Sequence, residues 1–246
     1  MANNIAFHSG SLYIIRQGIA VPQPVKLMTV QETSFDFKGD TKELMGENQF
    51  SVDVAVGSIK ITGKCKHGQL DPKAMNELFF GQTIAVGSRV LVQNELATVA
   101  TASITAAAGV NFDTDFGVTN TATGEVYTRV ASGPTAKQYS LNVATGVYTL
   151  NATENGNVLS IDYIKRDTTG GTQLTLNNQQ AGATVTFKGV FTKKYRDGRI
   201  LTLELAQCVA DSLQFAAKLN DYVLPEFNFG AFADSTNKVM TLSVSA

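Results

Sequence analysis

The sequence predicts a mainly β protein that carries one short α-helix and a small β domain inserted into a larger one. Three observations lead to this fold class. Apolar and polar residues alternate at every second position along most of the 246 residues, which is the pattern of half-buried strands. A single stretch, 71–80, instead has helical spacing. Over 97–167 charged residues become sparse, and Ala, Thr, Gly and Asn take over.

The strands follow from the alternation. Phe50, Val52, Val54 and Val56 recur at every second position, so they are predicted to share one face of a strand. Asp197-Gly198 is predicted to form a turn between two such runs. The other predicted strand segments are 12–15, 25–37, 59–64, 126–130, 139–143, 147–150, 184–194, 200–209, 213–219, 227–232 and 239–244.

The helix over 71–80 is predicted from its two ends. Asp71 can cap the free amides of the first turn, Pro72 suits the first helical position, and Gly81 suits a left-handed stop. Apolar side chains spaced i, i+3 and i+4 form one stripe. The residues predicted to pack on a sheet through this stripe are Met75, Leu78 and Phe79.

The composition shift predicts two domains. Residues 1–96 and 168–246 form the larger β core, and 97–167 form the small β insert. Asn155-Gly156 stands between two apolar runs, and both positions tolerate positive φ, so a two-residue hairpin is expected there.

Composition and charge exclude several classes of protein. Hydrophobic residues make up 43% of the chain, enough for a sizeable core, while charged residues make up only 17% against roughly 25% in an average soluble domain. A sparsely charged surface suits a protein packed against copies of itself. The net charge of −1 predicts no strong attraction to nucleic acid or membranes. Neither a signal peptide nor a spanning helix is expected, so the chain is predicted to be soluble and made in a cytoplasm.

No constellation of residues predicts catalysis, a cofactor or a metal. Cys65 and His67 share a strand face by alternation, which is a weak basis for a nucleophile and its base. Cys65, His67 and Cys208 lack a fourth zinc ligand, and His8 is near the N-terminus. Asp113-Thr114-Asp115 lacks the continuation of a calcium loop. The chain is therefore predicted not to be an enzyme.

Two blocks of sequence resemble the major tail tube proteins of long-tailed (siphovirus-like) bacteriophages. The C-terminal block begins with YRDGRILTLEL at 195–205 and continues through 213–215, 221–229, 231–234 and 239–242. The N-terminal block has a strand entering KELMG at 42–46, a strand leaving it, then Gly63 and the helix. Segment 117–163 is similar to a β module common in phage structural proteins.

The resemblance implies a two-sheet β-sandwich or half-barrel of tail-tube type with a flanking helix. It implies hexameric rings, stacked so that their inner sheets enclose a lumen through which DNA passes without sequence-specific binding. The partners would be copies of the chain and other tail proteins, the chain would reside in the virion tail, and the host bacterial cytoplasm would be its place of synthesis.

The resemblance also implies a projecting hairpin over about 38–47 that reaches a neighbouring ring. The segment is strongly charged in a charge-poor chain and contains an isolated apolar pair, which would insert into the neighbouring subunit. The alternative interpretation is a solvated hairpin tip. The residues of the predicted inter-subunit hairpin are Lys38, Asp40, Lys42, Glu43, Leu44, Met45 and Glu47.

Two other functions compete with the tube. The chain could be another virion part, such as a capsid decoration or an adhesin-like β protein, with the Thr/Gly-rich insert as its active surface. A carbohydrate-active or proteolytic β enzyme is the third class, and it lacks the acid, base or nucleophile that such chemistry needs.

Overall fold

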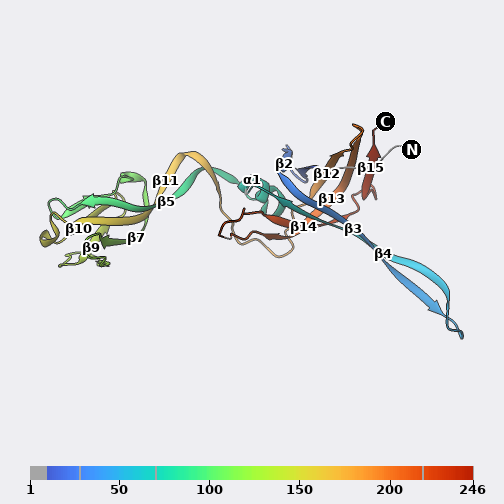
Figure 1. Ribbon diagram of the computed structural model, residues 1–246, viewed down its shortest axis with the longest axis horizontal. Helices are drawn as coiled ribbons and strands as arrows, with labels where there is room; N and C mark the ends of the chain where they lie inside the picture. Colours follow the sequence, from blue (N-terminus) through green and yellow to red (C-terminus); the bar gives the residue numbers. More distant parts are fainter. Residues whose placement is uncertain (1–9, 28, 70, 218, 246) are drawn as a thin grey trace. The chain divides into compact units, whose positions relative to one another are not determined.

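The computed structural model describes residues 10–27, 29–69, 71–217 and 219–245, and it is mainly β, as predicted. The chain divides into two compact units (Figure 1). Unit 1 comprises Met1–Thr83 and Leu174–Ala246, and unit 2 comprises Ile84–Gln173. The predicted insert, 97–167, lies inside unit 2, but unit 2 begins earlier, at Ile84, and ends later, at Gln173. The strands β5 (Ile84–Thr98) and β11 (Val158–Leu174), which are neighbours in one sheet, belong to unit 2 along nearly their whole length.

Unit 1 is built on one eight-stranded sheet. Its order is β2-β1-β12-β13-β14-β4-β3, and β15 pairs with β13 beside this path. All the pairs in this sheet are antiparallel. The strands are β1 (Ser11–Arg16), β2 (Val25–Leu27), β3 (Val30–Met45), β4 (Ser51–His67), β12 (Phe187–Lys194), β13 (Ile200–Gln214), β14 (Glu226–Phe232) and β15 (Met240–Val244).

The sheet of unit 1 curls over its own core. Phe35 on β3 and Phe191 on β12 are four strands apart in the sheet order, which would separate them by about 19 Å in a flat sheet. Their ring centroids are only 5.3 Å apart. Phe35 also meets Phe229 of β14 edge to face. The sheet therefore folds into two facing layers, as expected for a sandwich or half-barrel.

The helix predicted over 71–80 is confirmed in its bounds and caps. It runs as α1 (Pro72–Met75) and continues as a π-helical turn, η1 (Asn76–Phe80). The Asp71 carboxylate accepts a hydrogen bond from the Lys73 amide at 2.9 Å, and Gly81 has φ of 60°. The helix packs against β1 and β13.

The apolar stripe of the helix is shifted from the predicted one. Ala74 and Leu78 are buried in the core of unit 1, and Phe79 is half-buried against that core. Met75 is half-buried and is not one of the core residues, so its predicted place is wrong. The π-helical turn holds more residues than an α-helical turn, which rotates the stripe away from Met75.

Unit 2 consists of two small sheets around an aromatic core. One sheet has the order β5-β11-β7 and the other β6-β10-β9-β8. Phe112 stacks on Tyr163 at 5.1 Å and meets Tyr148 edge to face at 5.9 Å. The remaining elements are β6 (Ser103–Thr105), η2 (Gly109–Asn111), β7 (Phe112–Asn120), β8 (Thr128–Arg129), β9 (Gln138–Asn142), β10 (Val147–Leu150) and η3 (Ala152–Glu154).

The hairpin predicted at Asn155-Gly156 is wrong. β10 pairs with β6 and β9, whereas β11 belongs to the other sheet. The Asn151 side chain accepts a hydrogen bond from the Thr153 amide at 3.0 Å and starts the 3₁₀ turn η3. This turn carries the chain from one sheet to the other, and Asn155 has φ of −56° rather than a positive value.

Candidate functional site

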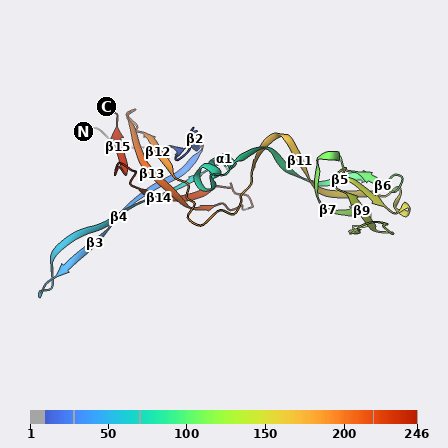
Figure 2. The same ribbon diagram turned by 180° about the vertical axis from the view of Figure 1, so that it is seen from behind.

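The β3–β4 hairpin extends far beyond the sheet to which it belongs (Figures 1 and 2). The inner part of β4, from Ile61 to Lys66, pairs with both β3 and β14. Outward of Ile61, β3 and β4 are paired only with each other among the described strands. From residue 36 to residue 60 every side chain except the half-buried Ser51 is exposed. This outer part, residues 36–60, is called the hairpin arm below.

The hairpin arm presents an apolar stripe to solvent. Val52, Val54 and Val56 occupy alternate positions of β4, so they share a face, and they are 72%, 54% and 63% exposed. Val56 and Ile59 both lie within 3.7 Å of the position that a Cβ atom on Gly39 would occupy. The stripe is therefore continuous through Ile59 with Ile61, which is buried in the core of unit 1.

An exposed apolar surface of this kind is unusual for a monomer. Soluble monomers rarely leave contiguous large apolar side chains in water, and larger patches mark interaction sites. Burying a valine side chain stabilises a complex by about 1.5–3 kcal/mol at most. The stripe thus offers enough apolar surface to drive association, while the fold of unit 1 leaves it uncovered.

The predicted inter-subunit residues all lie on the hairpin arm. Residues 38–45 belong to β3, and the turn of the hairpin falls at 46–50. Leu44 is paired with Asp53, so it lies on the reverse face from Val54, which is paired with Glu43. Leu44 and Met45 are 64% and 57% exposed. Their insertion into a neighbouring subunit stays a prediction.

The charges of the hairpin arm are largely unpaired. Lys38, Lys42, Glu43 and Glu47 form no ion pair with any residue that the structure describes, and Lys38 lies directly opposite Lys60. Two lysines that face each other across a strand pair destabilise it modestly. The Asp40 carboxylate accepts a hydrogen bond from the Ser58 hydroxyl at 3.2 Å. The arm therefore carries charges that remain available to an external partner.

Cys65 and His67, the weak candidates for a nucleophile and its base, are not activated for catalysis by their surroundings. Cys65 and His67 are both buried in unit 1. Burial raises the pKa of the Cys65 thiol to about 12, against a smaller opposite effect of a hydrogen bond with Thr33. The thiolate that a cysteine nucleophile needs is therefore scarce. His8 lies outside the described residues, and among the described ones no three His, Cys, Asp or Glu side chains gather as a metal site.

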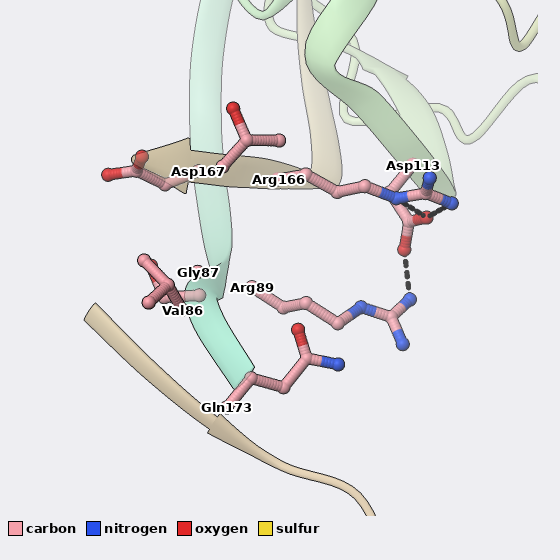
Figure 3. A pocket seen from close by; sticks show the side chains of 9 residues that line it. Val86, Gly87, Arg89, Asp113, Arg166, Asp167 and Gln173 are labelled. Carbon is pink, nitrogen blue, oxygen red and sulfur yellow. Dashed lines mark hydrogen bonds and ion pairs between the residues drawn. The ribbon is translucent and has the colours of Figure 1, made fainter. Parts of the chain in front are cut away.

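The Asp113-Thr114-Asp115 segment contributes to two separate polar clusters of unit 2. Asp115 accepts hydrogen bonds from the hydroxyls of Tyr139 at 2.7 Å and Tyr148 at 3.1 Å. Burial and the Asp115 carboxylate raise the pKa of both tyrosines. Asp113 instead binds two arginines in an open cavity (Figure 3). No spacing in the sequence indicates that arginine cluster, because its members come from three different strands.

The comparisons with known proteins give no family. No protein-family model matches the chain, and no curated protein matches it either. In the described part of the chain, no helix is both long and apolar enough to cross a lipid bilayer.

Proposed function

We propose that this chain is a structural virion protein whose copies polymerise as stacked rings into a phage tail tube. The rings are hexameric in the family that the sequence resembles, and the tube is the conduit through which the genome leaves the virion. The observation that carries the proposal is the hairpin arm, whose apolar stripe is exposed and continuous with the core of its own unit.

The edges of the unit 1 sheet support assembly as well. β3 is sixteen residues long and is the terminal strand of the sheet order. A long edge strand has a row of unpaired backbone amides and carbonyls, which in a monomer is a template for further pairing. Ring closure satisfies such edges by pairing strands of adjacent copies. The lysines of β3 would disfavour pairing with arbitrary strands and select a complementary surface.

A capsid decoration or adhesin-like protein is the second candidate. Unit 2 favours it, because this unit has its own aromatic core and presents a polar cavity that the tube model does not use. The two functions differ in what the purified protein should do. A tube protein forms hollow filaments, whereas a decoration protein remains a small oligomer until it meets a capsid.

Electron microscopy of the purified full-length chain and one shortened variant tests the proposal. Thr41 and Val56 are register partners, so residues 42–55 can be replaced by Asn-Gly, which closes two-residue hairpins. We expect hollow filaments from the full-length chain. The shortened variant should keep the same circular dichroism spectrum and remain unassembled. Filaments of normal length from the variant, or none from the full-length chain, would contradict the proposal.

A further inference from the structure

Unit 2 contains an open cavity of about 410 Å³ to which the proposed assembly gives no role (Figure 3). It is formed by the first residues of β5, the last residues of β11 and the start of β7. Its volume lies in the range of small-molecule sites, roughly 300–1,000 Å³. The lining residues are Val86, Gly87, Ser88, Arg89, Asp113, Arg166, Asp167, Thr168 and Gln173.

Two arginines are held in place at one end of the cavity. Arg89 and Arg166 both bind the carboxylate of Asp113, whose side chain is only 5% exposed. Burial alone would raise the pKa of Asp113, but the two guanidinium groups reverse this effect and hold that pKa below its usual value. Asp113 is therefore ionised, and it fixes two long side chains that would otherwise lose conformational entropy on binding a ligand.

The arginines keep unused donors. Arg89 employs one terminal nitrogen for Asp113 and Thr114, and Arg166 employs Nε and one terminal nitrogen for Asp113. A guanidinium has five N–H groups, so several on each arginine have no partner among the described residues. The side chains are 49% and 63% exposed. The Arg89–Asp113–Arg166 triad thus has a net charge of +1 and faces solvent with free N–H groups.

The cavity also contains an ordered hydrogen-bond acceptor. The Oδ1 atom of Asp167 accepts hydrogen bonds from the Thr169 amide at 2.9 Å, the Thr169 hydroxyl at 3.0 Å and the Gly170 amide at 3.0 Å. These bonds lower the pKa of Asp167, and the bond from the Thr169 amide has the largest effect. The second oxygen, Oδ2, takes no part in them and can accept from a ligand hydroxyl. Figure 3 shows Asp167 lying apart from the guanidinium ends.

Two glycines allow the strands that form the cavity to approach each other. Gly87 has φ of 126°, and a Cβ atom there would lie 2.9 Å from the Asp167 carbonyl oxygen. Gly171 has φ of 86°, and a Cβ atom there would lie 2.8 Å from the Cβ of Ser88. Any other residue at either position would be strained and would push β5 and β11 apart.

We propose that this cavity binds an anionic monosaccharide unit, free or at the end of a glycan. Its carboxylate or phosphate group binds the free N–H groups of Arg89 and Arg166, and its ring hydroxyls donate to Asp167 and exchange hydrogen bonds with Thr168. The lining carries two positive and two negative side chains, so a bare anion meets the opposing charge of Asp167. A neutral sugar has no anionic group to pair with the positively charged triad. Only a ligand with both groups satisfies both ends.

Isothermal titration calorimetry of the full chain tests the ligand class. The probes are glucuronate, glucose 6-phosphate, glucose and inorganic phosphate. We expect at least one anionic sugar to bind about tenfold more tightly than both glucose and inorganic phosphate. Whichever of glucuronate and glucose 6-phosphate binds more tightly shows whether the cavity prefers a carboxylate or a phosphate group. Equal binding of glucose, or no binding of either anionic sugar in the ~10 mM range, would overturn the proposal.

Matched variants test the residues. R89Q should weaken binding of the preferred sugar about tenfold. R129Q is the control, because Arg129 also pairs with a buried aspartate of unit 2, Asp115, and is 48% exposed, yet lies outside the cavity. T168V leaves the triad intact and should also weaken binding, which guards against a folding defect in R89Q. Equal effects of R89Q and R129Q, with T168V unchanged, would contradict the assignment. The titrations are repeated on the variant with residues 42–55 replaced by Asn-Gly, which keeps all of unit 2 and is expected to remain unassembled, so the result does not depend on tube formation.

Discussion

Gly63 shows how a single position limits the packing of unit 1. It lies on β4 beneath the ring of Phe229, and a Cβ atom there would be 2.2 Å from the ring Cζ. Phe229 is 1% exposed and contacts Phe35, Phe187 and Phe227. The ring therefore has little room to move aside, and the absence of a side chain at position 63 is a requirement of the core.

We predict that Gly63→Ala destabilises the protein by about 1–3 kcal/mol, as overpacking of a core does. Gly230→Ala is the matched control. Gly230 lies on the adjacent strand, and a Cβ atom there would have nothing within 4 Å. Urea unfolding, monitored by circular dichroism, measures the stability of both variants. Equal unfolding midpoints for the two variants would show that the Phe229 ring moves freely.

His67 makes the stability of unit 1 depend on pH. It is 4% exposed, its Nδ1 atom has no partner among the described residues, and its ring packs edge-on against Phe227. Burial lowers the pKa of His67 below 6.5, against smaller opposite effects of a hydrogen bond that the imidazole donates to the Gln69 backbone and of the charge of Asp71. The unfolded chain thus binds a proton at a higher pH than the folded chain does.

The direction in which the free energy of unfolding changes with pH follows from this difference in proton binding. The contribution of His67 to the free energy of unfolding is complete above a pH of about 6.5 and is lost as the pH falls toward the lowered pKa of the folded state. We predict that the urea midpoint decreases between pH ~7.5 and ~5.5. His67→Gln should flatten that decrease. A variant with the same pH dependence as the wild type would assign the effect to other groups.

At the scale of single elements, local chemistry predicts the helix and fails at a hairpin. The helix depends on Asp71, Pro72 and Gly81, which act within a few residues, so the sequence contains all the information needed for its ends. Asn155-Gly156 has equally strong turn chemistry. The outcome there depends on Asn151, whose side chain starts η3 and directs the chain into another sheet. Which strands pair is a long-range property that turn residues do not determine.

The hairpin arm illustrates a second limit of pattern analysis. The alternation of Val52, Val54 and Val56 correctly predicts a strand with one apolar face. The predicted strand ends at 37 and a projecting hairpin follows over about 38–47, whereas β3 continues to Met45 as the partner strand of β4. Because side chains on both faces of the hairpin arm are exposed, both faces are solvated, and charge no longer distinguishes a strand from a turn. The turn itself falls at 46–50.

At the scale of the whole molecule, the division into units comes from strand pairing and not from composition. The composition shift at 97 falls inside unit 2, because β5 begins at Ile84 and is the neighbour of β11 in one sheet of that unit. The arginine cavity was likewise not predictable. Arg89, Asp113 and Arg166 are on three strands, and only the order β5-β11-β7 brings them together.

We predict that replacing 84–173 with a short Gly/Ser linker leaves unit 1 folded. The chain enters and leaves unit 2 on neighbouring strands, so a short linker can close the gap at little entropic cost. Replacing only 97–167 should give a less soluble protein, because it removes the core of unit 2 against which Val92 of β5 packs and so exposes that side chain. Soluble yield and the unfolding transition of both variants check this. An unfolded product from the first deletion would mean that unit 1 depends on unit 2.

The central claim is that the apolar stripe of the hairpin arm drives assembly of copies of the chain. Sedimentation velocity of the wild type and two triple variants tests it most directly. Val52, Val54 and Val56 are changed to Thr, which keeps shape and strand propensity but replaces a methyl group with a hydroxyl. The control variant changes Val86, Val126 and Val158 of unit 2, which are also exposed, to Thr. We predict large assemblies for the wild type and the control and monomers for the hairpin variant. Assemblies of equal size in all three would contradict the account.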